Sequence, residues 1–345
     1  LPALKLAAQR IESVHAKQKP KDLSYIDEQG VGLGLRWRAL DSVGLYVPGG
    51  TASYPSSVLM NAIPAKVAGV KRCVITVPSL NGMINPMVLA AADIAGSTEV
   101  YRIGGAQAIA ALAYGTESIV PVDKIVGPGN AYVATAKKMV YGKVGIDSIA
   151  GPSEVVIVAD QKNNPEWIAY DLLAQAEHDT AAQSILITDD NSFADLVVSA
   201  IDDVLKSLPR SEIAEKSWND HGAIIVLNSL DEAPSLIDML APEHLQFAID
   251  NPDKLSNKVS HAGAIFLGRY TPEAIGDYVA GPNHVLPTNK TARFSSGLSV
   301  FDFLKRTTIV DCNSDSLRAI APSAITLANA EGLDAHARSI AIRMK

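Results

Sequence analysis

Short apolar runs alternate with longer stretches of helical periodicity along most of this chain, and that alternation constrains the fold more than any other feature. It is typical of parallel strands joined by crossover helices. The sequence therefore predicts an α/β protein with two open-sheet domains of similar pattern and a mainly helical tail over 314–344. The expected strands are 43–47, 73–78, 100–103, 124–126, 154–159, 184–188, 223–227, 245–249 and 264–267, and the expected helices are 1–17, 55–68, 85–95, 106–114, 130–141, 165–182, 192–208 and 231–240.

Size and charge limit the function classes. A chain of 345 residues exceeds the size at which one core keeps growing, so we expect two domains or more. The net charge of −7, without a block of like charge, disfavours nucleic acid and anionic membranes as partners and fits a small neutral or cationic substrate. No apolar run is long enough to cross a bilayer. Cys73 and Cys312 have no CxxC neighbour, which predicts free thiols and a cytoplasmic protein.

Four of the seven histidines stand close to a carboxylate, a carboxamide or a turn proline. Imidazole nitrogen, carboxylate oxygen and amide oxygen are ligands for borderline metals, and a Glu-His pair can accept protons. The pattern predicts an enzyme with a metal-assisted acid/base site. The four groups are Gln175 with His178 and Asp179, Glu243 with His244, Asp277 with His284, and Glu331 with His336.

Each group also has an ordinary explanation. Gln175 and His178, three apart on an expected helix, share one face and could grip one ion, or they could mark a solvated helix end. Glu243-His244 follows Pro242 at a strand entrance, where the pair can divide the work of a general base between two steps, but exposed Glu-His pairs are also common. Asp277 alone indicates a solvated loop carboxylate. We interpret the remaining histidines as surface or structural residues: His15, His221 and His261.

Glycine and proline punctuate the strand ends, which is where open α/β sheets bind ligands. The dinucleotide fingerprint G-x-G-x-x-G is absent between a strand and a helix. Gly104-Gly105-Ala-Gln107 and Gly127-Pro-Gly-Asn130 instead stand before helices, whose first N–H groups and dipole favour phosphate. Ordinary turn chemistry explains such glycines as well. Glycine and proline also occur at two further strand ends, in Pro48-Gly49-Gly50 and Gly151-Pro152.

The whole chain resembles histidinol dehydrogenase. No single segment is decisive, but together they are specific and they occur in the expected order. The segments that carry the resemblance are Gly44–Gly50 (GLYVPGG), Arg102–Ala111 (RIGGAQAIAA), Val126–Asn130 (VGPGN), Ile149–Glu154 (IAGPSE), Leu173–Asp179 (LAQAEHD), Ala241–Leu245 (APEHL) and Gly276–His284 (GDYVAGPNH).

The resemblance implies a function and a set of site residues. The family oxidises L-histidinol to L-histidine in two NAD-dependent steps through a retained aldehyde and requires zinc, one ion per subunit. By resemblance, Glu243 activates water and His244 is the general base. The implied zinc ligands are Gln175, His178, Asp277 and His336, the last from the partner subunit of a homodimer. The implied substrate contacts are Ser153, Glu331 from the partner subunit, Gln175, His178, His244, Asp277 and His336, and the implied NAD contacts are Tyr46, Gln107 and Asn130.

The resemblance also implies a domain plan. It predicts two incomplete Rossmann-like domains, one inserted in the other, and a helical tail that serves dimerisation. The expected bounds are 1–45 with 153–300 for the substrate and metal domain, 46–152 for the NAD domain and 301–345 for the tail. Members of the family usually carry a further N-terminal segment, and because this chain opens at Leu1 we expect a fragment or a processed form.

Other hypotheses remain open from the residues alone. One is a related zinc and NAD dehydrogenase acting on another small polar alcohol. A zinc hydrolase, in which Glu243 activates water toward an amide or ester, is a second. A dimeric binding protein without catalysis is a third.

Overall fold

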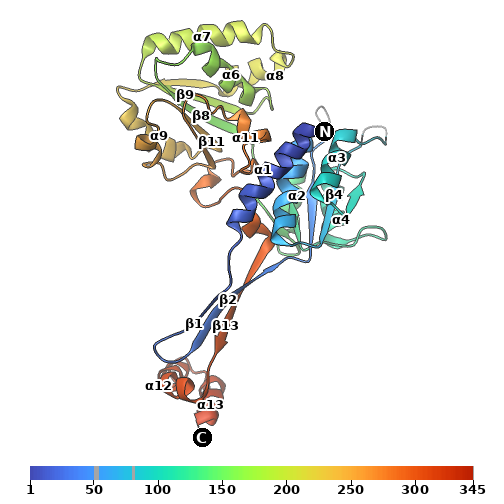
Figure 1. Cartoon of the computed structure of the whole chain (residues 1–345), viewed down its shortest axis with the longest axis vertical. Coiled ribbons are helices and arrows are strands. Elements are labelled where there is room, and N and C mark those ends of the chain that lie inside the picture. Colours follow the sequence, from blue (N-terminus) through green and yellow to red (C-terminus); the bar gives the residue numbers. More distant parts are fainter. Residues whose placement is uncertain (50–53, 80–81, 345) are drawn as a thin grey trace. The chain divides into compact units, whose positions relative to one another are not determined.

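The computed structural model describes residues 1–49, 54–79 and 82–344, so Gly50 of the first glycine-rich segment lies outside the described residues. The chain divides into two compact units (Figure 1). The first contains Leu1–Gln18 and Asp41–Phe303, and the second contains Lys19–Leu40 and Leu304–Lys345. The α/β class with open parallel sheets and a helical C-terminal tail is confirmed. The predicted domain bounds stay a prediction.

The first parallel sheet of the first unit is built from residues 42–146. β3 is the central strand of this sheet. The next two strands in the sequence, β4 and β5, lie on one side of it, and the last two, β6 and β7, lie on the other side. The point where the order reverses, between β3 and β6, is where a doubly wound sheet opens a crevice at its carboxyl edge. In spatial order the strands are β5 (Glu99–Tyr101), β4 (Arg72–Thr76), β3 (Ser42–Tyr46), β6 (Lys124–Val126) and β7 (Gly145–Ile146).

Helices cover both faces of this sheet. Buried residues of α4 (Gly105–Tyr114) and α5 (Ala131–Val140) pack with Tyr46, Val74 and Ile125 of the strands. On the other face α2 (Pro55–Ala68) contacts β3, and α1 (Pro2–Gln18) and α3 (Pro86–Ala95) contact α2. Asn85 caps α3 as predicted, because its side chain accepts the N–H of Met87 while Pro86 opens the helix.

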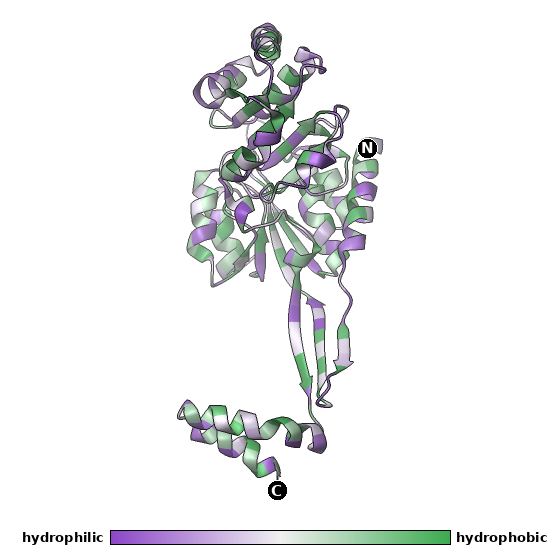
Figure 2. Ribbon diagram, turned by 90° about the vertical axis from the view of Figure 1, so that its left-hand side faces the viewer, coloured by the Kyte–Doolittle hydropathy of each residue, from purple (hydrophilic) through white to green (hydrophobic). Residues whose placement is uncertain are grey.

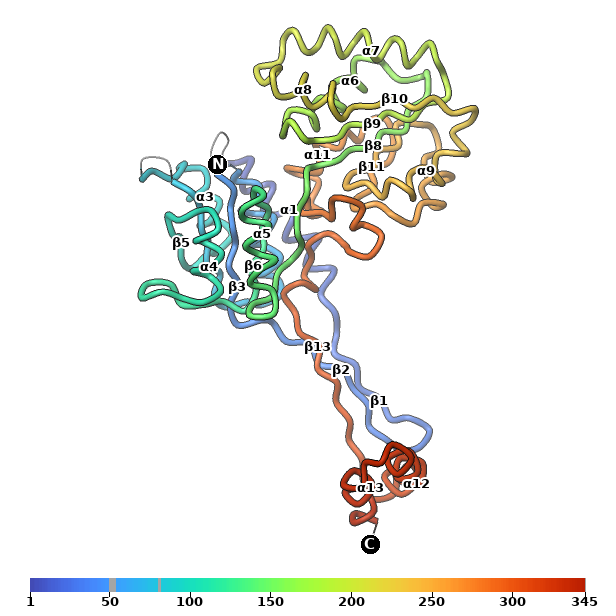
Figure 3. The backbone as a smooth tube through the Cα atoms, turned by 180° about the vertical axis from the view of Figure 1, so that it is seen from behind, coloured from blue at the N-terminus to red at the C-terminus, as the bar shows by residue number. Residues whose placement is uncertain are grey.

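The second parallel sheet repeats the plan. The segment 147–153 carries the chain from the first sheet to the second, along the green trace that reaches β8 in Figure 3. The order again reverses next to the first strand, here between β8 and β11. In spatial order the strands are β10 (Ala223–Val226), β9 (Gln183–Thr188), β8 (Glu154–Ala159), β11 (His244–Ala248) and β12 (Ala264–Leu267).

Alternate strand residues of this sheet build two cores. Val155 and Ile157 of β8 pack with α6 (Pro165–Ala176), α7 (Asn191–Leu205) and α8 (Ser211–His221), which lie on one side of the sheet in Figure 1. Val156 and Val158 point to the opposite face and pack with α9 (Ala233–Leu240) and α10 (Asp253–Ser256). Successive side chains of a strand point to opposite faces of the sheet, and both faces of β8 are buried. The sequence of β8 is therefore continuously apolar instead of alternating.

Two elements near the site differ from the sequence prediction. The helix expected over 165–182 ends at Ala176, so His178 lies in the turn that follows it. One cause is Asp179, whose carboxylate accepts the N–H of Ala181 and so offers the backbone a turn in place of the helix. Asp277, expected in a loop, lies instead in the short helix α11 (Ala274–Tyr278).

The second unit is a three-stranded antiparallel sheet with two helices. Its strands are β1 (Leu23–Ile26), β2 (Gly32–Ala39) and β13 (Leu304–Asp311), and its helices are α12 (Ser314–Ala330) and α13 (Asp334–Ala341). Hydrophobic and hydrophilic residues both occur along α12 and α13 (Figure 2). Within the described residues, none of the helices has the length and apolar character that a bilayer crossing needs.

Candidate active site

The centre of the site is the pair Glu243-His244, which the second sheet holds at the amino end of β11. Ala241 takes left-handed backbone angles (φ 48°) and turns the chain out of α9, and the following proline disfavours a further helical residue at this position. Pairing of β11 with β8 then places His244 opposite Val155. The prediction that the pair stands at a strand entrance is confirmed.

One residue of β8 holds both catalytic candidates. The backbone N–H of Glu154 donates to Oε2 of Glu243 at 3.0 Å, and the backbone carbonyl of Glu154 lies 3.0 Å from Nδ1 of His244. Because a carbonyl only accepts, Nδ1 carries the proton and Nε2 keeps its lone pair. The two side chains are therefore fixed next to each other, with Nδ1 of His244 3.7 Å from Oε2 of Glu243.

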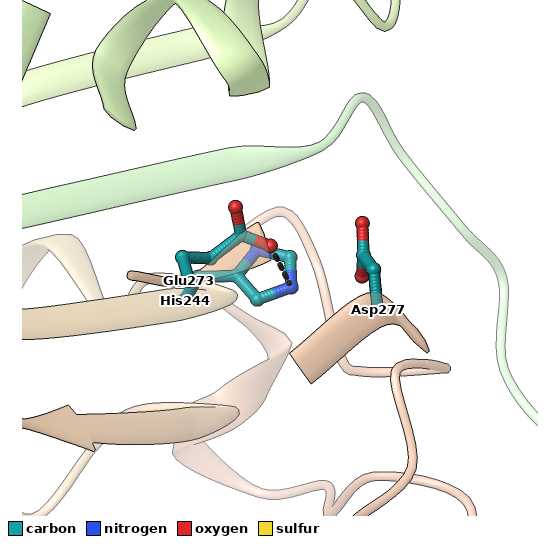
Figure 4. Close-up of side chains that lie close together, drawn as sticks. All are labelled: His244, Glu273 and Asp277. Carbon is teal, nitrogen blue, oxygen red and sulfur yellow. Dashed lines mark ion pairs between the residues drawn. The ribbon is translucent and has the colours of Figure 1, made fainter. Parts of the chain in front are cut away.

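His244 is a neutral base in this environment. Burial lowers the pKa of its imidazole to about 4, and the nearby Asp277 carboxylate offsets only part of that shift. Its Nε2 faces Oε1 of Glu273 at 3.4 Å (Figure 4). At neutral pH the imidazole therefore presents an unprotonated nitrogen that can accept a proton.

Carboxyl groups crowd around this imidazole. Burial raises the pKa of Glu243 well above its usual range; the N–H of Glu154 opposes the rise, and the charges of Glu154, Asp277 and Glu273 add to it. Burial, followed by the charges of Asp277 and Asp171, raises the pKa of Glu273 to about 8. Because these carboxyls are buried and close to one another, they cannot all be ionised unless a positive charge lies nearby.

Asp277 is the carboxylate that stays ionised. Burial is the largest single influence and raises the pKa of this carboxyl, whereas His284, whose Nδ1 lies 3.4 Å from Oδ1 of Asp277, lowers it through a hydrogen bond and through its charge. The imidazoles of His244 and His178 also act on Asp277 electrostatically, so the net pKa is lowered. In the part of the chain that the structure describes, ligand atoms of His244, Glu273 and Asp277 lie within 4.8 Å of one another, close enough to hold one metal ion.

The buried side chain of Gln175 indicates a ligand site. Its side chain is 1% exposed, yet neither Oε1 nor Nε2 has a hydrogen-bond partner among the described residues. A buried carboxamide without partners costs free energy, which a cation accepting Oε1 as a ligand would offset. Gln175 lies in the last turn of α6, and the backbone N–H of His178 donates to its carbonyl at 3.2 Å. The residues present therefore fit a cation.

Sequence reasoning missed the residues that support this cluster from behind. Gln246 is fully buried; its Nε2 donates to Asp171 at 2.7 Å, and its Oε1 accepts the backbone N–H of Glu273 at 3.1 Å. The start of α11 is thereby fixed against β11. Glu273 stands four residues before Asp277, which is a helical spacing, but α11 is too short for that pattern to be recognised.

The predicted NAD contacts lie at the carboxyl edge of the first sheet. Tyr46 ends β3, and its hydroxyl accepts the backbone N–H of Gly105 at 3.1 Å. Asn130 caps α5, with its Oδ1 accepting two backbone N–H groups, and Gln107 is exposed in the first turn of α4. All three border the point where the strand order reverses.

Two glycines at this edge lie where a side chain would collide with neighbouring residues. A Cβ on Gly104 would lie 2.3 Å from Cγ of Pro78, and a Cβ on Gly127 would lie 2.2 Å from the carbonyl oxygen of Tyr46. Packing within the protein therefore requires glycine at both positions.

The remaining predicted residues lie in separate places. Ser153 directly precedes β8, and its carbonyl accepts the N–H of Gln183. Glu331, at the end of α12, and His336, in the first turn of α13, belong to the second unit and are exposed.

Comparison with known proteins places the chain among close relatives. The family model for histidinol dehydrogenase matches residues 1–344. The chain is 66% identical to the histidinol dehydrogenase of Rhodospirillum rubrum, over 99% of this chain and 79% of that protein. It is 63% identical to histidinol dehydrogenase 1 of Trichormus variabilis, over 99% of this chain and 80% of that protein.

Solved structures agree on the fold. The crystal structure of histidinol dehydrogenase from Elizabethkingia anophelis matches with a TM-score of 0.96 at 40% identity, over 99% of this chain and 79% of that one. A propionaldehyde dehydrogenase from Clostridium phytofermentans matches with a TM-score of 0.52 at 13% identity, over 90% of this chain and 88% of that one, which shows a shared fold alone.

Asp171 makes the stability of this region depend on pH. Burial raises the pKa of its carboxyl from 3.8 to about 6, so the folded protein favours the protonated form. The associated stabilisation is complete below pH 3.8 and is lost as the pH rises through 6. We expect Asp171→Asn, which keeps an acceptor for Gln246, to raise the free energy of unfolding at pH 8 by about 1–3 kcal/mol and to have little effect near pH 4.

Chemical denaturation at both pH values measures this difference. Asp203→Asn is the matched control, because Asp203 is 77% exposed and should change stability by less than about 0.5 kcal/mol. If Asp171→Asn changed the free energy of unfolding equally at pH 4 and pH 8, the raised pKa of Asp171 would be wrong.

Proposed function

The chain belongs to the histidinol dehydrogenase family, and from that premise we propose that it oxidises L-histidinol to L-histidine in two steps, with NAD as the hydride acceptor in each. The first step turns the alcohol into an aldehyde and releases one proton. The second adds water and turns the aldehyde into a carboxylate. The observation that supports this assignment is that the backbone of Glu154 contacts both Glu243 and His244 and so holds two candidate bases side by side.

His244 is the base of the first oxidation. Its Nε2 is unprotonated, because Nδ1–H is committed to the carbonyl of Glu154 and because burial keeps the ring neutral. A substrate hydroxyl facing Nε2 can pass its proton there as the hydride leaves the carbinol carbon. Glu273, 3.4 Å from the same nitrogen, is the neighbouring group able to exchange that proton.

Glu243 is the base of the second oxidation. A carboxylate that removes a proton from water is most effective when its pKa lies near the working pH, and burial shifts Glu243 in that direction. The N–H of Glu154 holds Oε2, which fixes the carboxyl while the other oxygen remains for water. The water adds to the aldehyde carbon, and the hydrate then loses the second hydride.

Gln175, His178 and Asp277 would hold the zinc ion, with His336 of the partner subunit as the fourth protein ligand. The unpartnered carboxamide of Gln175 and the ionised carboxylate of Asp277 support this set. Zinc in such a site supplies an anchor for the imidazole and amine of the substrate and so orients the carbinol carbon. His244 and Glu273, which also lie near Asp277, are kept for proton transfer in this proposal.

Other residues of the chain would position the two organic molecules. Tyr46, Gln107 and Asn130 border the crevice of the first sheet and would contact NAD there. Ser153 and Glu331 of the partner subunit would contact the substrate. A homodimer is therefore part of the proposal. The two cysteines are unpaired, which fits work in the reducing cytoplasm.

The direct test is the product balance. We expect the zinc-loaded protein to form two NADH and one histidine for each histidinol consumed, with no turnover when NAD is left out. Removing the metal with a chelator should abolish this activity, and added zinc should restore it. Absorbance of NADH and chromatography of histidine measure both products. Histidinol consumption without NADH would contradict the proposal.

Glu243→Gln should separate the two steps. The amide keeps an acceptor for the N–H of Glu154 but cannot take a proton from water, so we expect oxidation of the aldehyde to slow by about 10²–10⁴-fold. Oxidation of histidinol to the aldehyde should change far less. Rapid-mixing measurements of NADH, started from the alcohol or from the aldehyde, give the two rates.

Glu154→Gln is the matched control for that experiment. It removes one negative charge from the same region but leaves both backbone contacts of residue 154 in place. The first step should keep nearly the rate of the unaltered enzyme, and the second should change far less than in Glu243→Gln, because the charge of Glu154 is only one of the lesser causes that shift the pKa of Glu243. If Glu243→Gln slows both steps equally, the division of roles is wrong.

Mixed dimers test the shared metal site. His336→Ala and His178→Ala homodimers should each lose zinc and activity. A dimer with one chain of each kind contains one site in which all ligands are intact, so we expect turnover up to about half that of the unaltered enzyme. Purification of the mixed dimer through two different tags, followed by zinc analysis and an activity assay, measures the rescue. No rescue would mean that each site is built from one chain.

A further inference from the structure

The first sheet contains a buried ion pair that the proposed chemistry does not use. Lys137 of α5 is 2% exposed, and its ammonium contacts the carboxylate of Asp147, which directly follows β7. The side chains of both residues are almost fully buried. Around them the core of this sheet is apolar, with neighbours that include Val133, Val140 and Val144.

Both members of the pair grip a single residue, Gly127. Nζ of Lys137 donates to the carbonyl of Gly127 at 3.0 Å, and Oδ2 of Asp147 accepts the N–H of Gly127 at 2.7 Å. The ammonium of Lys137 therefore binds the carbonyl of Gly127, and the carboxylate of Asp147 binds its N–H. These are charge-assisted hydrogen bonds, which are shorter and stronger than neutral ones.

Gly127 is where the chain leaves β6 for the turn that leads to α5. Its φ of +107° lies in a region that favours glycine, and a Cβ there would collide with the carbonyl of Tyr46. Two residues later a Cβ on Gly129 would lie 2.4 Å from Cγ1 of Val133. The turn Gly127–Asn130 is thus tightly specified, and it borders the crevice at the carboxyl edge.

Stability alone is a poor explanation for such a pair. Taking two charges out of water costs several kcal/mol per ion, and apolar residues of similar volume often stabilise a core equally well or better. An apolar pair, however, offers nothing to the N–H and the carbonyl of Gly127. Lys137 is also too deeply buried to reach a bound dinucleotide itself. Its effect on the cofactor must pass through the turn.

We propose that Lys137 and Asp147 are positioning residues for the dinucleotide, because their ion pair fixes the Gly127 backbone and with it the turn that presents Asn130 and the start of α5. This inference rests on the proposed function, in which that turn contacts NAD. It adds a role for two residues that would not touch the cofactor.

The double variant Lys137→Met/Asp147→Leu separates positioning from stability. It replaces the pair with apolar side chains and leaves the Gly127 backbone without either partner. In the zinc-loaded enzyme we expect the Kd for NADH, measured by fluorescence titration, to rise about tenfold or more, which corresponds to ~1.4 kcal/mol. The KM for NAD should rise with it. The KM for histidinol and the zinc content should stay near those of the unaltered enzyme.

The same sheet offers a matched control. Arg72 and Glu99 form another ion pair, 2.7 Å between Nε and Oε1, at the amino ends of β4 and β5, away from the carboxyl edge. Arg72→Met/Glu99→Leu removes two charges from the sheet and should leave the Kd for NADH unchanged. Should the double variant at 137 and 147 fail to fold, the single variants Lys137→Met and Asp147→Asn are compared with Arg72→Met and Glu99→Gln in the same way.

Three results would overturn the inference. The first is an unchanged Kd for NADH in the folded variants at positions 137 and 147. The second is an equal loss of NADH affinity in the control pair, which would indicate a general effect of lowered stability. The third is an unaltered enzyme that binds no NADH, which would overturn the proposed function together with the inference. The first two results leave the proposed function intact.

Discussion

The parallel pairing of β8 with β11 is the constraint on which the active site depends. In this register Glu154 lies beside the entrance to β11, where its N–H reaches Glu243 and its carbonyl reaches His244. A slip of one residue would turn the side chains of β11 to opposite faces. The chemistry of the pair is thus set by two backbone groups of a neighbouring strand, which side-chain substitutions at position 154 do not remove.

The candidate sites lie at opposite edges of the two sheets, and the helix dipoles at each edge fit the ligand that we propose for it. The carboxyl edge of the first sheet receives the N-termini of α4 and α5, whose positive ends favour the phosphates of a dinucleotide. The site residues of the second sheet lie at its amino edge, where α6 and α9 end. Helix C-termini favour positive charge, which suits a metal ion and a cationic substrate. The rule that ligands bind at the carboxyl ends of strands agrees with the proposed NAD site, whereas the proposed metal and substrate site lies at the other edge of its sheet.

The sequence predicted what depends on periodicity and short motifs. The alternation of strands and helices, the Asn85 cap and the strand entrance at His244 all follow from local pattern. The side chains of β1 and β13 in the second unit are mostly exposed, and no alternation of apolar and polar residues marked these strands in the sequence. Glu273 could not be predicted either, because its role depends on the contact between α11 and β11. Helical spacing suggested that Gln175 and His178 could share one ion, whereas the predicted contribution of His336 from a partner subunit came from family resemblance, since spacing cannot bring distant residues together.

The buried acids of the second sheet make sense only with a positive charge among them. Glu243, Glu273 and Asp171 all have raised pKa values, and the Gln175 carboxamide has no partner among the described residues, so the fold accepts several unfavourable groups in one place. A cation bound beside Asp277 would lower the pKa values of the carboxyls nearest to it and release protons as it binds. The same charge would bring Glu243 toward the ionised form that its proposed role requires. Binding of such a cation would therefore recover stability that the protein gives up at this edge of the sheet.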